Sequence, residues 1–242
     1  MFDQGELGSC TANAASGMVG FYLNRLNGSS LPVSRLFIYK TTRNLMLETG
    51  DNGATIRSTM GSLALFGAPP EKYWEYVVKE FDVEPPAFCY SFASNYQALV
   101  YFKHEARPYS AVSAQIGASS QFEHDSVNST LNSVKKHLCL GIPSMFGFTV
   151  YTSIRDAVDG KIAFPSVKES VLGGHAVLAV GFDDSMKIGS TTGALIIRNS
   201  WGSSWGDNGY GYLPYEYVTS GLAKDFWSMV KEEWVDTTMF GV

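Results

Sequence analysis

Of the three cysteines in the chain, one stands where a helix is expected to begin. Cys10 follows Gly8 and Ser9 and opens a stretch in which apolar residues recur at helical spacing. The unpaired N–H groups and the dipole at a helix N-terminus favour a thiolate over a thiol, which makes the sulfur a better nucleophile. A free cysteine is more commonly a small buried hydrophobe, and this is what we expect of Cys89 and Cys139, which lie among apolar neighbours.

Two later segments offer partners for this thiol. His175 begins an apolar strand directly after two glycines in GGHAVLAVGFDD, where a ligand could approach the backbone closely. Asn199 ends another strand in LIIRNSWGSSWGDNGYGY, and the tryptophans after it, Trp201 and Trp205, could help to orient an imidazole and shield its hydrogen bond from water. The remaining histidines lie in polar or amphipathic contexts and are predicted to be surface residues: His104, His124 and His137.

In order and character, three segments resemble the catalytic segments of the papain-like cysteine peptidases, the papain and cathepsin family: DQGELGSCTANA, GGHAVLAV and IIRNSWGSSWGDNGYGY. A fourth, DNGATIRSTMGSLALFG, is similar to that family's Asn-Gly-Gly stretch and the helix after it. Together they cover the length of the chain. The resemblance implies a cysteine endopeptidase with a papain-like α+β fold, in which a helical half packs against a β-barrel-like half with the active-site cleft between them.

The resemblance also implies roles for four residues. Cys10 matches the nucleophile, His175 its ion-pair partner, Asn199 the residue that holds the imidazole, and Gln4 the amide that forms the oxyanion hole with the Cys10 N–H. In such a site a thiolate attacks a carbonyl, amide donors hold the oxyanion, and the imidazolium protonates the leaving amine. No metal or other cofactor is required, and the cysteines do not have the close spacing of zinc ligands.

Alignment with the family's substrate-binding segments adds seven residues: Gly53, Ala54, Ile56, Gly147, Gly174, Ala176 and Trp201. Gly53 and Ala54 would pair through their backbone with an extended peptide, so the expected partner is a peptide or protein substrate. The walls at Ile56, Gly147, Gly173 and Ala176 are small or aliphatic. They predict a preference for a large apolar residue second before the scissile bond, and weak selection at the residue beside that bond.

Several positions depart from the family's pattern. Thr11 stands where an aromatic residue usually follows the nucleophile, and Ala54 replaces a glycine. Leu7 and Asp51 occupy the two half-cystine positions of a disulfide beside the nucleophile, which predicts membership of the subset that lacks this bond. The histidine and asparagine lie further from the cysteine than is usual, so insertions are predicted near residues 111–124 and 183–192.

Composition indicates a folded globular chain without the features that bind nucleic acid or a membrane. The 242 residues are 45% hydrophobic and 17% charged, and the net charge is −5. No run of Lys or Arg exceeds two residues, so there is no electrostatic footprint for nucleic acid or an anionic membrane. No apolar stretch approaches the roughly 20 residues that span a bilayer. No signal segment precedes Cys10, and the compartment stays open, with a secreted or lysosome-like location among the options.

Hydrophobic periodicity predicts the elements that must position the candidate residues. Helices are expected at 9–26, 34–45, 55–66 and 126–140, the first capped by Ser9 and ended by Asn27 and Gly28. Strands are expected at 144–151, 175–182, 194–199 and 209–213. A helical subdomain over residues 1–105 and a β-rich subdomain over residues 106–242 follow from this order, within one peptidase domain.

Two alternatives would use the same fold. A peptidyl or acyl transferase would employ the same Cys-His pair with a protected amine in place of water, and the sequence does not separate transfer from hydrolysis. A non-catalytic peptidase-like binding protein would commonly have lost a catalytic residue, whereas all four are of the required types here. The family's inhibitory propeptides predict, in addition, that the natural product extends upstream of Met1 and that the extension blocks the cleft.

Overall fold

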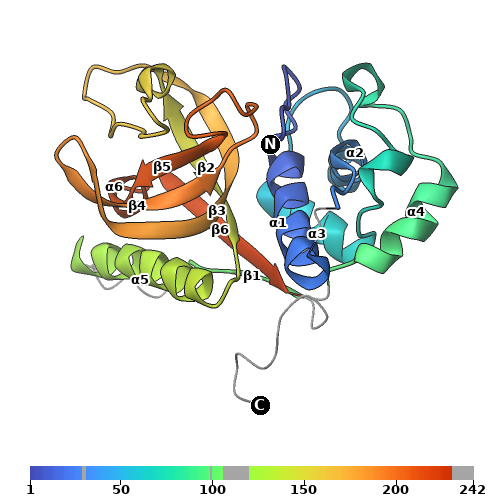
Figure 1. The fold of residues 1–242 in the computed structure, drawn as a ribbon, viewed down its shortest axis with the longest axis horizontal. Coiled ribbons are helices and arrows are strands. Elements are labelled where there is room, and N and C mark those ends of the chain that lie inside the picture. The colour runs from blue at the N-terminus through green and yellow to red at the C-terminus, as the bar shows by residue number, and fades with distance from the viewer. Residues whose placement is uncertain (29–30, 99, 106–119, 231–242) are drawn as a thin grey trace, which may run out of the picture.

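Helices gather on one side of the molecule and an antiparallel sheet on the other, so the chain has the predicted α+β fold (Figure 1). The structure is a computed structural model that describes residues 1–28, 31–98, 100–105 and 120–230. The helical side contains α1 (Cys10–Asn27), α2 (Arg35–Met46), α3 (Ile56–Leu65) and α4 (Ala87–Ala93). Single 3₁₀ turns lie at Glu71–Tyr73, Val78–Glu80, Ser94–Tyr96 and Thr152–Asp156. The first three helices confirm the predicted ones, and α4 was not predicted.

Local capping explains where these helices begin and end. The Ser34 hydroxyl accepts a hydrogen bond from the Phe37 N–H at the start of α2, and Thr55 caps α3 in the same way. Gly28 ends α1 in the left-handed conformation, as predicted. Ser9 is the N-cap residue of α1, as predicted, but its hydroxyl makes no capping bond and bonds instead to the Tyr76 hydroxyl and to the Asn13 side chain.

A six-stranded antiparallel sheet forms the other side, in the order β1-β6-β2-β3-β4-β5. The strands are β1 (Val100–Lys103), β2 (Ser144–Tyr151), β3 (Val171–Ile188), β4 (Thr191–Arg198), β5 (Tyr210–Pro214) and β6 (Ala223–Val230). Two helices accompany them, α5 (Ser120–Cys139) and α6 (Tyr215–Thr219). Strands β2 to β5 confirm the predicted strands, although β3 is much longer than expected, and β1, β6 and α6 were not predicted.

The long β3 accounts for one of the two expected insertions. Residues 183–188 extend β3 and pair with the start of β4 in a hairpin. Most of the other expected insertion, residues 111–119, lies outside the described residues. Division of the chain at residues 105 and 106 stays a prediction; β1, which precedes that point in the sequence, pairs with β6 at the sheet edge.

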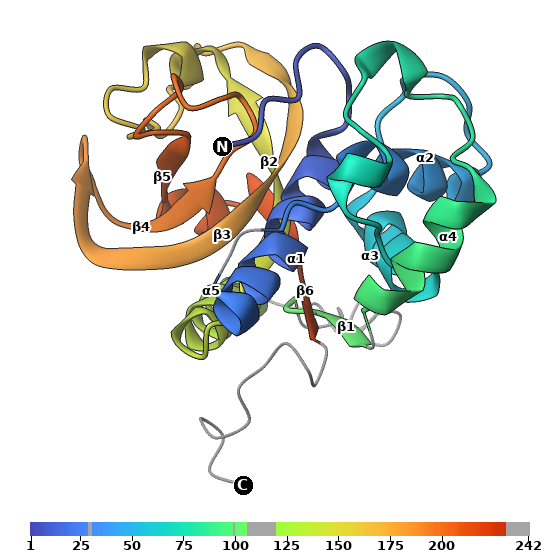
Figure 2. The same cartoon turned by 45° about the vertical axis from the view of Figure 1, so that its right-hand side comes forward.

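Two large hydrophobic cores and one small one around Phe37 form the interior of the described residues, and α1 lies between the sheet and the other helices of its half (Figure 2). The first core joins α1, α2 and α3 to sheet residues that include Met145, Leu178 and Met229. The second lies within the sheet and its covering helices, around Phe146 and Phe226. Burial of this apolar area supplies most of the driving force for folding. Because α1 contributes to the first core, its N-terminus is fixed against the sheet.

Two of the side-chain predictions are wrong. Cys139 is exposed near the end of α5 rather than buried, while Cys89 is buried as expected. His104 is buried between β6 and α5, where its ring nitrogens bond to the hydroxyls of Ser133 and Ser228 at 3.0 and 2.8 Å. The two serines satisfy both ring nitrogens, which lets a polar ring lie in the interior. The side chain of His124 lies outside the described residues.

Candidate active site

A cavity of about 720 Å³ lies where the helical half meets the sheet. From the helical half it is lined by residues at the start of α1 and at the start of α3. From the sheet it is lined by residues of β2, β3 and β6. The lining residues are Gln4, Gly8, Cys10, Thr11, Asp51, Asn52, Gly53, Ala54, Thr55, Ile56, Gly147, Phe148, Thr149, Gly174, His175, Ala176, Leu222, Lys224 and Asp225. Three of the four predicted catalytic residues therefore share one cavity.

Cys10 is the first residue of α1 and is half-buried at the cavity wall. The backbone N–H groups of Ala176 and Thr11 are near its sulfur and favour the thiolate. Burial raises the pKa of the Cys10 thiol, and these N–H groups act in the opposite direction. Ala176 is the residue directly after His175, so the sulfur lies beside the histidine strand.

His175 projects from β3 and is only 8% exposed. Its Nε2 lies 2.7 Å from Asn199 Oδ1. Because an amide oxygen only accepts, Nε2 must carry the proton, which leaves the lone pair of the other ring nitrogen, Nδ1, free to take one. Burial lowers the pKa of His175 to about 4, and the bond to Asn199 opposes this shift.

Aromatic rings enclose this imidazole. Trp201 stacks on His175 with ring centroids 4.6 Å apart and an interplanar angle of 25°. Trp205 packs edge-on against Trp201, and Phe148 approaches the imidazole edge-on from β2. Trp201 therefore covers one face of the imidazole, and Trp205 packs against Trp201; that they shield the bond between His175 and Asn199 from water stays a prediction.

Gln4 lies at the cavity wall with its side-chain amide fixed at both ends. Its Nε2 donates to the Leu7 carbonyl at 3.0 Å, and its Oε1 accepts from the Ser200 hydroxyl at 2.6 Å. The backbone N–H of Gln4 also donates to the Ser200 carbonyl. One hydrogen of the Nε2 amide remains for a ligand in the cavity. Sequence reasoning missed Ser200, although it stands between Asn199 and Trp201 in the most specific segment.

Most of the predicted substrate-binding residues line the cavity: Gly53, Ala54, Ile56, Gly147, Gly174 and Ala176. Gly147 faces Ala176 across the β2–β3 pair, and a Cβ at Gly147 would lie 3.7 Å from the Ile56 Cδ1. Glycine at that position leaves room beside Ile56. Trp201 packs behind the imidazole instead, and Gly173 is not among the lining residues.

The far wall of the cavity comes from a part of the chain that sequence reasoning did not assign. Leu222, Lys224 and Asp225 line it, at the start of β6. Asp225 is paired with Lys103 at 2.8 Å and accepts from the Trp227 indole. These residues could have been found only by predicting that β6 pairs with β2.

In the described ranges, no three or more His, Cys, Asp and Glu side chains gather closely enough to hold a metal ion. Within those ranges no helix is both long and apolar enough to cross a membrane.

Comparison with known proteins identifies the family. The sequence model of the papain family cysteine proteases matches residues 1–230, which is nearly the whole chain. The chain belongs to the papain family. It is therefore a cysteine peptidase, a hydrolase that acts on peptide substrates. All three of its cysteines are free, as expected for the subset without the disulfide beside the nucleophile.

Similar proteins come from several kinds of organism. An uncharacterized peptidase C1-like protein of Acanthamoeba polyphaga mimivirus is 36% identical over 234 residues, which span 93% of this chain and 68% of that protein. The crystal structure of xylellain, a cysteine protease from Xylella fastidiosa, has 32% identity and a TM-score of 0.75, with 95% and 82% of the two chains covered. A Carica candamarcensis cysteine protease shares the fold at 18% identity and a TM-score of 0.64, over 96% and 92% of the chains.

Proposed function

We propose that this papain-family member is a cysteine endopeptidase in which Cys10 is the nucleophile and His175 the general acid and base. Asn199 orients the imidazole, and Gln4 with the Cys10 N–H holds the oxyanion. The observation that carries this proposal is the bond between His175 Nε2 and Asn199 Oδ1, which leaves Nδ1 as the proton acceptor in a cavity shared with Cys10 and Gln4. Gln4 and Cys10 come from the N-terminal segment, His175 comes from β3, and Asn199 directly follows β4.

In the acylation half of the reaction, His175 Nδ1 takes the proton of the Cys10 thiol. The resulting thiolate attacks the carbonyl carbon of the scissile peptide bond, and the carbonyl oxygen becomes an oxyanion held by two N–H donors. His175 then returns the proton to the leaving nitrogen as the C–N bond breaks. The products of this half are a free amine and a thioester on Cys10.

Water completes the cycle. His175 removes a proton from water, the hydroxide attacks the thioester carbonyl, and the oxyanion forms again beside Gln4. When the C–S bond breaks, the carboxylic acid leaves and the sulfur regains its proton from His175. Trp201 and Trp205 keep the imidazole in one orientation through both halves.

Burial governs the charge state of the pair. It raises the pKa of Cys10 and lowers that of His175 to about 4, so each group resists carrying a charge alone. Transfer of one proton from Cys10 to His175 leaves the net charge of the pair unchanged, so the two groups ionise together. Activity should therefore rise with pH through about 4 and fall at alkaline pH as the pair loses its last shared proton.

Substrate preference follows from the cavity walls. Ile56, Gly147 and Ala176 form an open apolar pocket, and Leu222 adds an apolar group from β6. Burial of a large apolar side chain there is worth roughly 1.5 to 3 kcal/mol, or at least about tenfold in specificity. We expect the best substrates to carry such a residue second before the scissile bond. A peptide library that selects strictly for a charged residue at that position would contradict this.

Alkylation by an epoxide inhibitor of this family tests the proposed nucleophile. Intact mass should increase by one inhibitor, peptide mapping should place it on Cys10, and peptidase activity should disappear in parallel. Cys10→Ser should take up no inhibitor, while Cys139→Ser, which removes an exposed cysteine, should behave like the parent. Modification of Cys89 or Cys139 with Cys10 left free would overturn the assignment.

An inhibitory N-terminal propeptide that blocks the cleft stays part of the proposal. The similar structures include a digestive procathepsin L 3 of Tenebrio molitor, at 18% identity and a TM-score of 0.66, with 95% and 66% of the two chains covered. The test is to express the complete open reading frame and compare its activity before and after proteolytic processing. Equal activity before and after would rule out inhibition.

A further inference from the structure

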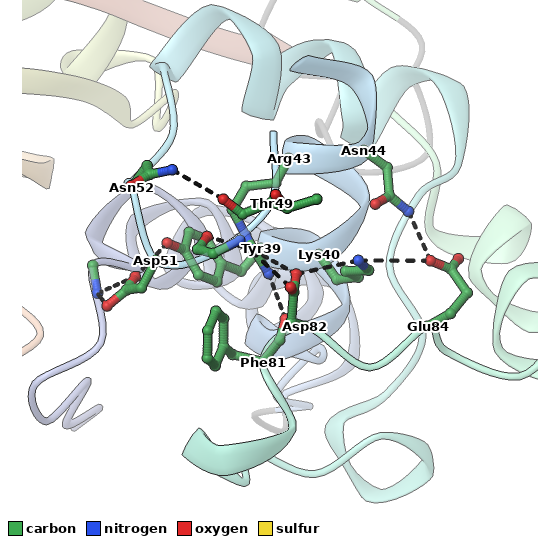
Figure 3. Close-up of polar contacts among 12 residues, drawn as sticks. Tyr39, Lys40, Arg43, Asn44, Thr49, Asp51, Asn52, Phe81, Asp82 and Glu84 are labelled. Carbon is green, nitrogen blue, oxygen red and sulfur yellow. Dashed lines mark hydrogen bonds and ion pairs between the residues drawn. The ribbon is translucent and has the colours of Figure 1, made fainter. Parts of the chain in front are cut away.

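The loop before α3 is attached to the nucleophile segment by one carboxylate. Asp51 accepts two hydrogen bonds from the Gly8 N–H, at 2.9 Å to Oδ1 and 3.1 Å to Oδ2 (Figure 3). Gly8 lies two residues before Cys10, and Asp51 lies two residues before Gly53. The side chain of Asp51 therefore bridges the nucleophile segment and the loop that is predicted to pair with substrate.

The hydroxyl group of Tyr39 binds the same loop. Its hydroxyl donates to Asp51 Oδ1 at 2.6 Å and accepts from the Gly53 N–H at 3.2 Å. Its ring is buried in the first core. Burial and the bond to Asp51 both raise the pKa of Tyr39, so the phenol stays protonated and continues to donate. Asp51 and Gly53 are thus held by one rigid hydroxyl group.

Arg43 holds the start of the loop. Its side chain is 0% exposed, lies over the Tyr39 ring, and donates through Nη1 to the Gly50 carbonyl at 2.7 Å and to Asp82 Oδ1 at 2.8 Å (Figure 3). Lys40 also pairs with Asp82, at 3.3 Å. A buried guanidinium requires such partners, so Gly50 is firmly anchored. The loop is therefore attached at three points, Gly50, Asp51 and Gly53.

Asp51 is suited to this task by its chemistry. A carboxylate accepts several hydrogen bonds at once, and those to a charged acceptor are about twice as strong as neutral ones. An amide would offer one oxygen and turn an NH₂ group towards the same donors. Within the described ranges no Lys or Arg lies within ion-pair distance of Asp51, so the three donated bonds are what orient it.

We propose that Asp51 is a positioning residue, which sets the substrate-pairing loop at residues 50–54 against the nucleophile segment by hydrogen bonds instead of a covalent link. This rests on the proposed peptidase function, because the loop matters through the peptide that it binds. Loss of the carboxylate frees the loop while Cys10, His175 and Asn199 keep their places. The defect should therefore appear in the binding of extended peptides rather than in the reactivity of the thiol.

Kinetics on two kinds of probe tests this. For Asp51→Ala, we expect kcat/KM for a peptide of four or more residues to fall about 10- to 100-fold, mostly through KM. Alkylation of Cys10 by iodoacetamide, which does not use the loop, should change less than about threefold. Asp51→Asn and Tyr39→Phe should be intermediate, since each keeps part of the network. The matched control is Glu48→Gln, which removes an exposed carboxylate three residues away.

Hydrogen exchange separates this proposal from the proposed peptidase function. The Gly8 and Gly53 amides, which donate to Asp51 and Tyr39, should exchange faster in Asp51→Ala than in Glu48→Gln, whether or not the protein cleaves peptides. Unchanged exchange at both amides would overturn the proposal. So would equal losses in peptide cleavage and iodoacetamide alkylation, because Asp51 would then act on the nucleophile or on the fold as a whole.

Discussion

The two sides of the cleft are held in place by different forces. On the sheet side, His175 and Asn199 are buried, joined by one hydrogen bond and covered by Trp201. On the helical side, the loop around Asp51 is exposed and is attached through hydrogen bonds to the Gly8 backbone and to Tyr39 and Arg43 of α2. The sheet side depends on the exclusion of water, whereas the loop on the helical side keeps its geometry in contact with water.

This difference suggests a division of labour between the two sides. Proton transfer benefits from a dry and rigid site, where hydrogen bonds are stronger than in water. An extended peptide needs exposed backbone groups with which to pair. Changes on the sheet side should therefore lower kcat, and changes in the loop should raise KM. The following predictions test that division, from the largest expected effect to the smallest.

Removal of either member of the Cys-His pair should have the largest effect. Cys10→Ser and His175→Ala should each lower kcat by about 10⁴-fold or more, because a hydroxyl is far harder to ionise and an alanine takes no proton. Steady-state kinetics measures this, and circular dichroism should show an intact fold for Cys10→Ser. Cys89→Ser and Cys139→Ser are the controls and should keep turnover. Faster thiol labelling of Cys89 or Cys139 than of Cys10 near pH 6 would refute the mechanism.

Loss of the oxyanion donor should come next. Gln4→Ala should lower kcat by roughly 10- to 1000-fold, with KM nearly unchanged, because the oxyanion exists only along the reaction path. Ser200→Ala should have a smaller effect in the same direction, since the Ser200 hydroxyl only orients the Gln4 amide. The two changes should be non-additive in the double variant. If Gln4→Ala raised KM and left kcat intact, the residue would belong to substrate binding.

Loss of the bond that orients the imidazole should be milder. Asn199→Ala removes one hydrogen bond worth about 1 to 1.5 kcal/mol, or roughly tenfold in kcat. Because that bond raises the pKa of His175, its loss should also move the acid limb of the pH profile to lower pH. Measurement of kcat/KM between pH 3 and pH 7 checks both effects. An acid limb that moves upward would mean that Asn199 does not stabilise the imidazolium.

The smallest expected effect is on stability in acid. Burial, with His137 nearby, lowers the pKa of His104 to about 4. In the unfolded chain His104 binds a proton near pH 6.5, whereas in the folded chain it does so only near pH 4. The stability that the neutral, buried ring contributes is therefore present above about pH 6.5 and is lost as the pH falls towards about 4. We expect His104→Gln to reduce the loss of unfolding free energy between pH 7 and pH 4.5 by about 2 kcal/mol, as measured in urea. An equal loss in both proteins would exclude His104 as a cause.

Much of the candidate site could be predicted from the sequence because three of the four predicted catalytic residues stand at or near the boundary of an element or of its buried part. Cys10 opens a helix, His175 begins the buried part of a long strand, and Asn199 directly follows β4. Boundaries of this kind are marked by glycine, serine and changes in periodicity, which are local signals. The helices α2 and α3 were predictable for the same reason, since Ser34 and Thr55 cap them.

The parts of the fold and of the site that could not be predicted depend on contacts between distant segments. Strand β1 has four residues, and β6 carries Lys224 and Asp225 near its start, so neither has a clear alternation of apolar and polar residues. Each becomes a strand because it pairs with the other, and β6 also pairs with β2. The burial of His104 and the far wall of the cleft follow from those pairings. Tertiary contact overrides local propensity at such positions.

The bond between Ser200 and Gln4 joins positions 196 residues apart, and this sets an order of events during synthesis. Ribosomes add about 5–20 residues per second, so Ser200 is made roughly 10 to 40 seconds after Gln4. For most of that interval the growing chain carries the Cys10 thiol without His175, and for all of it the Gln4 amide lacks the hydroxyl of Ser200. The nascent chain is thus expected to remain without peptidase activity until the segment from His175 to Ser200 has been made, which protects the chain and its neighbours at the ribosome.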